Sequence, residues 1–431
     1  MYISLSDRSG GKRDKPSGTR TALTTEVPFR LSPVILWLGI VSMVTDVSSE
    51  SVTAILPLYI TGFLGLSTIA FGFIDGINQG ASAIVRIAAG WAADRSGHPK
   101  RIALAGYGLS MVARIGFLFA GGFWAIAAIV TGDRIGKGIR TAPRDALITV
   151  SAQPEHLARS FGVHRMLDNI GAAAGPLIAF FVLLMIPNGF STVFVVSLAF
   201  AVIGVAVLAL VVPDLRAHGR MVANKAAAGD ERRLFAFSWR HFKEPGLGKL
   251  LIAAGLLGLL TVGDGFIYLV LQNRDSFAVQ WFPLLFVGTN VVFLAFAVPL
   301  GRLADRVGKV PVFVGGHAVL LLCYLLAAAP WGGLWATLGC LVLLGAFYAA
   351  TDGVLAALAS QLTPAGKLAT GIASAQTVVA LSRMLASAGF GVLWYAVGAS
   401  TAMLVAAGLL ACAVVVVIFI LPGAKSGMGR A

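Results

Sequence analysis

The sequence predicts an all-α membrane protein of twelve transmembrane helices, arranged as two pseudo-symmetric bundles of six. The 431-residue chain is 58% hydrophobic and only 12% charged, whereas soluble domains carry about a quarter charged residues. Its mean hydropathy is +0.86. A charged turn that starts at Gly90 recurs from Gly301, with the glycine and the following aspartate both displaced by 211 residues (301 − 90 and 305 − 94). Two such copies, each followed by an apolar run, indicate internal duplication.

The apolar runs are long enough for twelve spans, because a helix needs about 20 residues to cross a bilayer. We expect a first bundle over 33–212, a linker over 213–248 and a second bundle over 249–422. Aromatic and basic residues alternate over 232–243, so the linker could hold a short interfacial helix. The expected spans are 34–61, 68–93, 102–121, 123–140, 161–186, 191–212, 249–272, 281–301, 311–329, 333–357, 370–393 and 397–421.

Lysine and arginine concentrate in alternate loops, and in the opposite loops Arg274 is the one basic residue. The positive-inside rule places the basic loops in the cytoplasm. We therefore expect two cytoplasmic tails, a disordered one over 1–32 and another over 423–431, in a bacterial inner membrane. The same rule accounts for the net charge of +14 without a nucleic-acid partner. We expect a monomer in the lipid bilayer with no cofactor.

Each copy of the charged turn carries a glycine, an Asp-Arg pair and a second glycine. This pattern resembles the G-x-x-x-D-R-x-G signature of the major facilitator superfamily, and the resemblance extends over the whole chain past the N-terminal tail. It implies a secondary transporter in which these turns help to close a cytoplasmic gate. The gating residues that it assigns are Gly90, Asp94, Arg95, Gly97, Gly301, Asp305, Arg306 and Gly308.

Acidic residues at membrane depth are the candidates for proton coupling, because ionisable groups there usually face a bundle interior or a water-filled cavity. Asp46 and Glu50 lie four residues apart in the first span, which places them on one helix face. Two close carboxyl groups in a low dielectric favour proton uptake by one of them. The alternative is a structural pair neutralised by a cation such as Arg86. Asp168 and Asp264 are further candidates.

Other polar residues within the spans are expected to line a substrate cavity or to act as counter-ions. None belongs to a nucleophile–base grouping that would indicate a membrane enzyme, so we expect no catalysis. A receptor or scaffold would have no reason to keep paired buried carboxylates. The cavity and counter-ion candidates are Asp75, Gln79, Arg86, Arg114, Arg165, Asn169, Asn290, Gln376 and Arg383, and Asp352 is placed with the gate.

The fourth span contains Arg134 and Gly138 in an R-x-x-x-G arrangement. It resembles a superfamily signature whose arginine is associated with proton transfer. The longer run is similar to that of a bacterial subgroup of uncharacterised permeases. The alternative is a salt-bridge network that locks the cytoplasmic gate, and this alternative includes Asp133, Arg144 and Asp145.

The fifth span has Gly162, Gly171, Gly175 and Pro176 at the spacing G-x8-G-x3-G-P. It resembles the antiporter motif of superfamily exporters, although Ala179 replaces the motif's last glycine. The alternative is ordinary close packing of small residues. Two potential ligands in this span, His164 and Asp168, have no second ligand pair elsewhere, so no metal site is expected.

These observations predict a proton-coupled exporter of a small organic solute or drug. Uptake by proton symport and efflux of a metal ion remain as alternatives. The sequence does not define the substrate, because acidic, basic and aromatic residues all occur within the spans.

Overall fold

The computed structural model describes residues 31–96, 98–153, 156–214, 245–363 and 368–421, without the side chains of 84, 86–96, 158, 245 and 369. The expected tails and the linker segment 232–243 lie outside these ranges. The first bundle comprises α1 (Pro33–Leu58) with the π-helix η1 (Tyr59–Phe63), α2 (Thr68–Ser96), α3 (Pro99–Phe117), α4 (Phe123–Ser151), α5 (Leu157–Met185) and α6 (Phe190–Leu210). The second comprises α8 (Pro245–Leu259), α9 (Asp264–Asp275), η5 (Val279–Trp281), α10 (Pro283–Val307), α11 (Lys309–Ala328), α12 (Leu334–Gln361), α13 (Leu368–Val397) and α14 (Ala399–Ile420).

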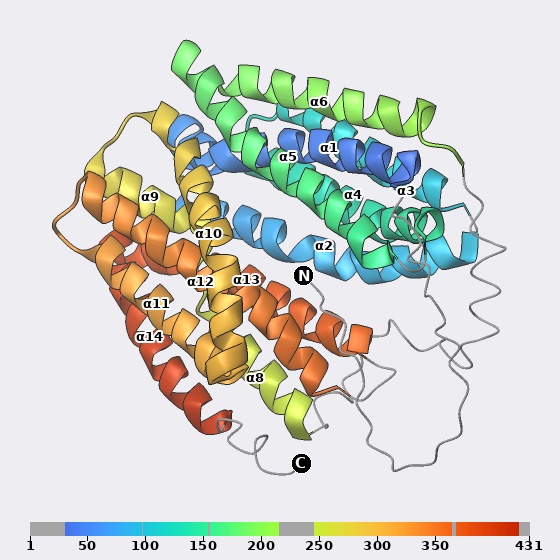
Figure 1. Ribbon diagram of the computed structural model, residues 1–431. Helices are drawn as coiled ribbons and strands as arrows, with labels where there is room; N and C mark the ends of the chain where they lie inside the picture. Colours follow the sequence, from blue (N-terminus) through green and yellow to red (C-terminus); the bar gives the residue numbers. More distant parts are fainter. Residues whose placement is uncertain (1–30, 97, 154–155, 215–244, 364–367, 422–431) are drawn as a thin grey trace, which may run out of the picture.

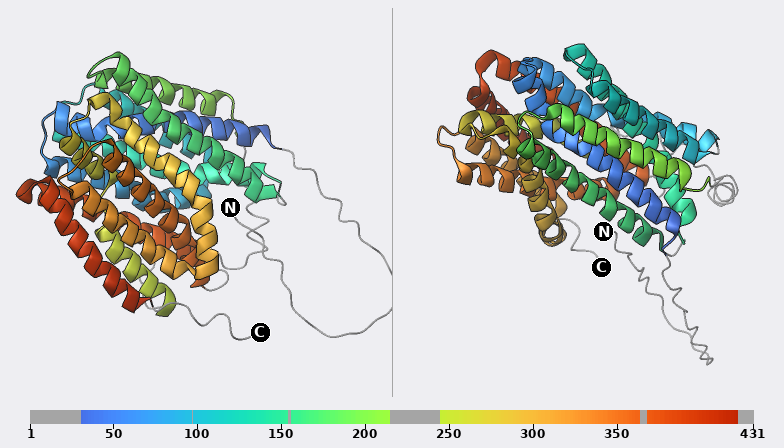
Figure 2. Two further views of the ribbon diagram at one scale, coloured as in Figure 1. Left: turned by 60° about the vertical axis from the view of Figure 1, so that its left-hand side comes forward. Right: turned by 90° about the horizontal axis from the view of Figure 1, so that it is seen from above.

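The two bundles lie side by side, with α1–α6 toward the upper right of Figure 1 and α8–α14 toward the lower left. We call the end where α6 finishes and α8 begins the linker end, and the opposite end the far end. Figure 2 shows from two further directions that the helices of each bundle run between these ends. Both copies of the charged turn, at the ends of α2 and α10, lie at the linker end, as the duplication predicts.

The prediction of twelve spans is confirmed, with α8 and α9 together forming the seventh. By length and composition alone, nine helices in the described part of the chain could cross a membrane. The remaining three spans are α2, α3 and α4, which carry many of the first bundle's charged side chains. The fourth span was predicted too short. It continues to Ser151 rather than ending at 140, because its charged residues pair inside the bundle.

The seventh span is broken, whereas the sequence predicted a continuous helix over 249–272. Tyr324 of α11 is fully buried and lies beside the break. Its hydroxyl accepts a hydrogen bond from the Val262 N–H at 2.7 Å and donates one to the Leu260 carbonyl at 3.1 Å. Backbone polar groups at membrane depth need such partners. Tyr324 therefore supports a non-helical segment that places Asp264 at the start of α9.

The bundles meet along α2 and α13 in their far halves. A Cβ atom added at Gly72 or at Gly76 would lie 2.6 Å from a backbone oxygen of α13, so only glycine permits this approach. Phe71 of α2 and Phe266 of α9 are both buried, and their ring centroids are 4.6 Å apart in an edge-on contact. These contacts close the molecule at its far end.

Candidate functional site

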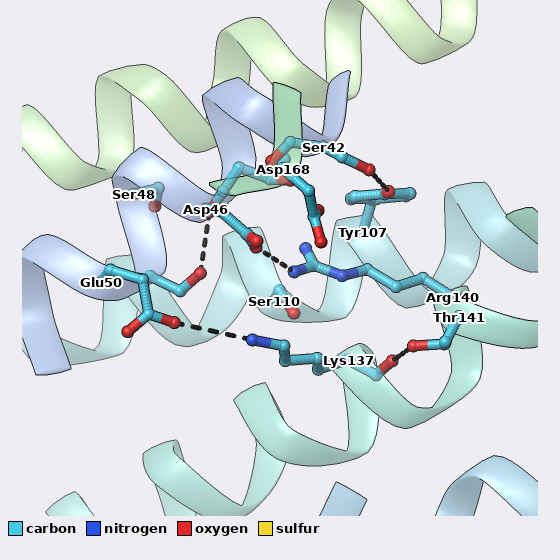
Figure 3. Close-up of polar contacts among 12 residues, drawn as sticks. Ser42, Asp46, Ser48, Glu50, Tyr107, Ser110, Lys137, Arg140, Thr141 and Asp168 are labelled. Carbon is cyan, nitrogen blue, oxygen red and sulfur yellow. Dashed lines mark hydrogen bonds and ion pairs between the residues drawn. The ribbon is translucent and has the colours of Figure 1, made fainter. Parts of the chain in front are cut away.

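A stripe of cations on α4 forms the core of the charged site. Lys137, Arg140 and Arg144 recur at intervals of three and four residues, so they share one helix face. Each lies near a carboxylate on α1 or α5, and Figure 3 shows the pairs of Lys137 with Glu50 and of Arg140 with Asp46. The Lys137 Nζ lies 3.6 Å from Glu50 Oε1, the Arg140 Nη2 lies 3.3 Å from Asp46 Oδ1, and the Arg144 Nη1 lies 3.7 Å from Asp168 Oδ1. The stripe thus ties together three helices of the first bundle.

A second cluster lies deeper in the first bundle, around Asp133. Its two carboxylate oxygens accept from Arg114 Nη2 and contact Arg134 Nη2, both at 2.9 Å. Arg114 also donates to Ser48 Oγ at 3.3 Å. Two buried guanidinium groups therefore share one carboxylate, and charge-assisted bonds of this length are among the stronger polar interactions in proteins.

Asp46 and Glu50 share a face as predicted, but they do not act as one carboxylate pair. Each has its own cation on α4, and the side chain of the expected counter-ion Arg86 lies outside the described residues. The carboxyl group that interacts with Asp46 is that of Asp168, on α5. Figure 3 shows both groups pointing toward the Arg140 guanidinium. The close pair of carboxyl groups is therefore Asp46 with Asp168.

The α5 glycines explain why Asp168 reaches Asp46. A Cβ atom at Gly171 would lie 2.2 Å from the Met43 carbonyl oxygen, and one at Gly175 would lie 2.8 Å from the Ser51 nitrogen. Both glycines thus press α5 against α1 within the same bundle. The neighbouring Pro176 lines the cavity between the bundles. A Cβ atom added at the motif's first glycine, Gly162, would meet nothing within 4 Å, so this glycine takes no part in the packing.

Gly171→Ala should destabilise the protein, because the added methyl group must push α1 and α5 apart. We expect a cost of about 1–3 kcal/mol, as for other overpacked cores, together with weaker coupling between Asp46 and Asp168. The melting temperature in detergent measures the first effect. Gly162→Ala in the same helix is the matched control and should melt as the wild type does. Equal melting temperatures for the two variants would contradict the packing role of Gly171.

A cavity of about 400 Å³ lies between the bundles. The first bundle contributes carboxylates, amides and one guanidinium group to its wall, and the second bundle contributes carboxylates, an amide and aromatic rings. The charged and amide residues that line it are Glu50, Asp75, Asn78, Gln79, Arg134, Asp264, Asn290 and Asp352, and the aromatic ones are Phe71, Tyr268, Phe286, Phe293 and Tyr348.

Two of the lining acids have defined partners in the second bundle. Asp75 is buried and accepts a hydrogen bond across the bundle interface from Ser387 Oγ at 2.5 Å. Asp264 accepts a hydrogen bond from the Tyr348 hydroxyl. The Arg383 guanidinium carbon lies 5.2 Å from the Tyr348 ring centroid and is not part of the cavity wall.

Several other predicted cavity residues lie elsewhere. Arg165, Asn169 and Gln376 are exposed and do not line the cavity. Arg114 is a partner of Asp133 rather than a cavity residue. Arg114 thus has the counter-ion role that was one of the two expected for this set. Arg165, Asn169 and Gln376 do not line the cavity, because sequence period gives a helix face but not the element that this face meets.

The structure describes the predicted gating residues of the two charged turns only in part. Gly97 and the side chains of Asp94 and Arg95 lie outside what the structure describes, and of Gly90 only its place in α2 is described. In the second copy, Asp305 is 74% exposed and lies 3.8 Å from Lys309. Gly308 has a φ of +102°, a conformation that favours glycine. In contrast, Arg306 is exposed, and a Cβ atom added at Gly301 would meet nothing within 4 Å.

The predicted gating residues of α4 lie inside the first bundle. A Cβ atom at Gly138 would lie 2.7 Å from Val85 of α2. The Asp145 carboxylate lies 3.0 Å from the Arg144 Nη2.

Sequence reasoning did not assign roles to Lys137, Arg140, Tyr348 or Ser387. A signal for the first two was present, since the spacing of Lys137, Arg140 and Arg144 matches the helical period of Asp46 and Glu50. No comparable signal identifies Ser387 as the partner of Asp75, because the two residues come from different halves of the chain.

Among the described residues, no three or more His, Cys, Asp and Glu side chains gather in a way that could hold a metal ion. Twelve spans in two similar bundles, with a polar cavity between them, define a multi-pass membrane transporter. The chain belongs to the Major Facilitator Superfamily, whose family model matches residues 38–288 and 272–430.

The chain is similar to an uncharacterized MFS-type transporter of Methanocaldococcus jannaschii, with 28% identity over 376 residues that cover 84% of this chain and 89% of the relative. It is also similar to an uncharacterized protein of Mycobacterium tuberculosis, with 34% identity over 140 residues that cover 32% of this chain and 34% of the relative.

Among solved structures, the nucleoside transporter NupG matches with a TM-score of 0.75 at 15% identity, covering 90% of this chain and 99% of that one. A POT family transporter in complex with 5-aminolevulinic acid matches with a TM-score of 0.73 at 13% identity, covering 90% and 96%. These structural matches concern the fold alone.

Proposed function

We propose that this transporter exports a small organic solute in exchange for protons by alternating access. The observation that supports it is the carboxyl pair of Asp46 and Asp168 inside the first bundle. Two carboxyl groups this close, in a low dielectric, tend to share one proton. Arg140 and Arg144 then compete with that proton for the pair. The pair can therefore act as a proton carrier.

Proton binding at this pair has a direct route to the cavity. Asp46 lies one helical turn from Glu50, which lines the cavity and pairs with Lys137. A proton on the pair would loosen the Arg140–Asp46 and Arg144–Asp168 contacts and so change how α4 is held against α1 and α5. A proton shifts the conformational equilibrium only if it binds the two states unequally. The different packing of the pair in the two states would supply that inequality.

The orientation follows from the basic loops, which favour the linker end as the cytoplasmic side of a bacterial inner membrane. With the far end closed by α2 and α13, the described state would load its substrate from the cytoplasm. This is the loading state that an exporter needs. The α5 glycines that resemble an antiporter motif also favour export. Uptake by proton symport would use the same carboxyl pair, with substrate and proton both moving into the cell.

Membrane vesicles test this proposal. Inverted and right-side-out vesicles are incubated with a panel of radiolabelled small organic solutes in the outer solution, with the pH gradient set across the membrane. We expect accumulation in inverted vesicles with an acidic interior and its loss when a protonophore is added. Vesicles without the protein are the control. Accumulation that occurs only in right-side-out vesicles with an inward proton gradient would establish uptake instead, and accumulation that survives the protonophore would contradict proton coupling.

A further inference from the structure

The wall of the cavity between the bundles carries a cation at one place and a group of carboxylates at another. On the first bundle the cationic group in the cavity wall is Arg134, which lines the cavity although its side chain is only 9% exposed. Its Nε has no hydrogen-bond partner among the described residues. Since Arg114 and Arg134 share the single carboxylate of Asp133, one positive charge of this cluster is not compensated.

The first bundle also brings an ion pair to the cavity, that of Glu50 with Lys137, and this pair carries no net charge. Glu50 lines the cavity and its carboxylate lies 3.6 Å from Lys137 Nζ. Arg134 is therefore the place on this wall where a negatively charged group of a ligand would gain a partner. A buried guanidinium with an unused donor favours a carboxylate or a similar planar anion.

The second bundle presents an acidic wall. Asp264 and Asp352 line the cavity together with Asp75 of α2. The nearby cation, Arg383, lies behind the Tyr348 ring at 5.2 Å from its centroid and does not reach the cavity surface. Asp352 makes no hydrogen bond or ion pair with any residue that the structure describes, and it is exposed where it lines the cavity. The carboxylates of this wall would therefore stabilise a cationic group of a bound ligand.

We propose that the cavity binds a small zwitterion, with its anionic group at Arg134 and its cationic group at Asp264 and Asp352. An uncompensated charge in a low-dielectric site is costly, and a ligand with both charges relieves both walls at once. A ligand with only one charge leaves the opposite wall unpaired. Phe286 and Phe293 also line the cavity, so an apolar side group would be accommodated. This inference rests on the proposed transport function and names the substrate class of the same site.

The cavity volume limits the size of this ligand. About 400 Å³ is at the lower end of the range for ligand pockets, roughly 300–1,000 Å³. The zwitterion should therefore have the size of an amino acid or a dipeptide. Larger amphipathic drugs would not fit in the described state.

Binding to the purified full-length protein in detergent tests the proposal without any gradient. The probes are matched triplets: L-phenylalanine with its methyl ester and its N-acetyl derivative, and alanyl-phenylalanine with its amide and its N-acetyl derivative. Each triplet compares a zwitterion, a cation and an anion on one scaffold. We expect at least one zwitterion to raise the melting temperature and to bind at least about tenfold more tightly than both single-charge analogues, a difference of about 1.4 kcal/mol. Equal or tighter binding of a single-charge analogue, or no binding of either zwitterion, would overturn the proposal.

Asp352→Asn is the decisive variant, because this carboxylate makes no hydrogen bond or ion pair with a described residue, and its longer-range interaction is with Arg383 outside the cavity wall. It should weaken the zwitterion and the cationic analogue by about tenfold, again about 1.4 kcal/mol, and leave the anionic analogue unchanged. Arg134→Gln should show the reverse selectivity. Asp214→Asn, at an exposed carboxylate 3.9 Å from Arg101, is the control for charge loss alone. Equal effects of Asp352→Asn on all three analogues would exclude a cationic subsite at Asp352.

The two proposals can fail separately. If neither zwitterion binds but the vesicles still accumulate a cation or an anion in a protonophore-sensitive way, the zwitterion inference is wrong and proton-coupled transport stands. If a zwitterion binds with the expected selectivity but its accumulation does not depend on the pH gradient, the site is right and the coupling is wrong.

Discussion

Replacing Asp133 by alanine should prevent the protein from forming a stable first bundle. Asp133 is buried and holds two buried guanidinium groups, those of Arg114 and Arg134, at 2.9 Å each. Its removal leaves both without a carboxylate, and breaking a buried ion pair in this way costs about 3–5 kcal/mol. Folded proteins have only about 5–15 kcal/mol of net stability, so the expected loss is a large fraction of it. The yield of monodisperse protein and its melting temperature in detergent measure the effect.

Two further variants separate charge from shape at this position. Asp133→Asn keeps the shape but loses the charge, so its stability should lie between those of the alanine variant and the wild type. Asp214→Ala removes an exposed carboxylate 3.9 Å from Arg101 and should cost less than about 1 kcal/mol. If Asp133→Ala were as stable as Asp214→Ala, the Asp133 cluster would not stabilise the bundle.

Neutralising Asp168 should abolish transport driven by the pH gradient while leaving the fold intact. Asp168→Asn keeps the shape of the side chain and also keeps the Asp46–Arg140 contact at 3.3 Å. It removes the second carboxyl group of the pair, so a proton can no longer be shared between α1 and α5. Asp46→Asn should have the same effect on transport but a larger effect on stability, because it leaves Arg140 without its carboxylate.

Exchange of labelled for unlabelled substrate in proteoliposomes distinguishes a coupling defect from loss of the site. In Asp168→Asn we expect exchange to persist and accumulation against a gradient to disappear. Infrared spectroscopy should also lose the band of a protonated carboxyl group. The matched control is Asp145→Asn, since Asp145 also contacts Arg144 but its side chain is 39% exposed. If Asp46→Asn and Asp168→Asn both accumulate substrate with unchanged pH dependence, the pair is structural and Asp264 becomes the next candidate.

The sequence predicts the number of spans and the duplication correctly, because apolar length and a repeated turn are local properties. The partner of Asp46 could not be predicted in the same way. The helical period shows that Asp46 faces a bundle interior, but it does not show that α4 and α5 meet this face. The prediction of Arg86 as counter-ion therefore relied on a cation in the neighbouring second span. Likewise, the α5 glycines indicate a close contact without indicating that the contacting helix is α1.

The break in the seventh span was missed for a related reason. Residues 249–272 are apolar almost throughout, so composition favours one helix. The local signal was the pair of glycines, Gly263 and Gly265, on either side of Asp264, since glycine is about 1 kcal/mol less favourable than alanine within a helix. That amount is too small to predict a break without knowing that Tyr324 supplies the backbone partners.

The break also constrains the order in which the protein is built. α8 has 15 residues and α9 has 12, which correspond to about 22 Å and about 18 Å of helix. Neither alone crosses a hydrocarbon core of about 30 Å, so the two must enter the membrane as one segment. During synthesis this segment precedes α11, and Tyr324 is not yet beside it to satisfy Leu260 and Val262. We therefore expect the seventh span to enter as a continuous helix and to open at residues 260–263 only after the ninth span has inserted next to it.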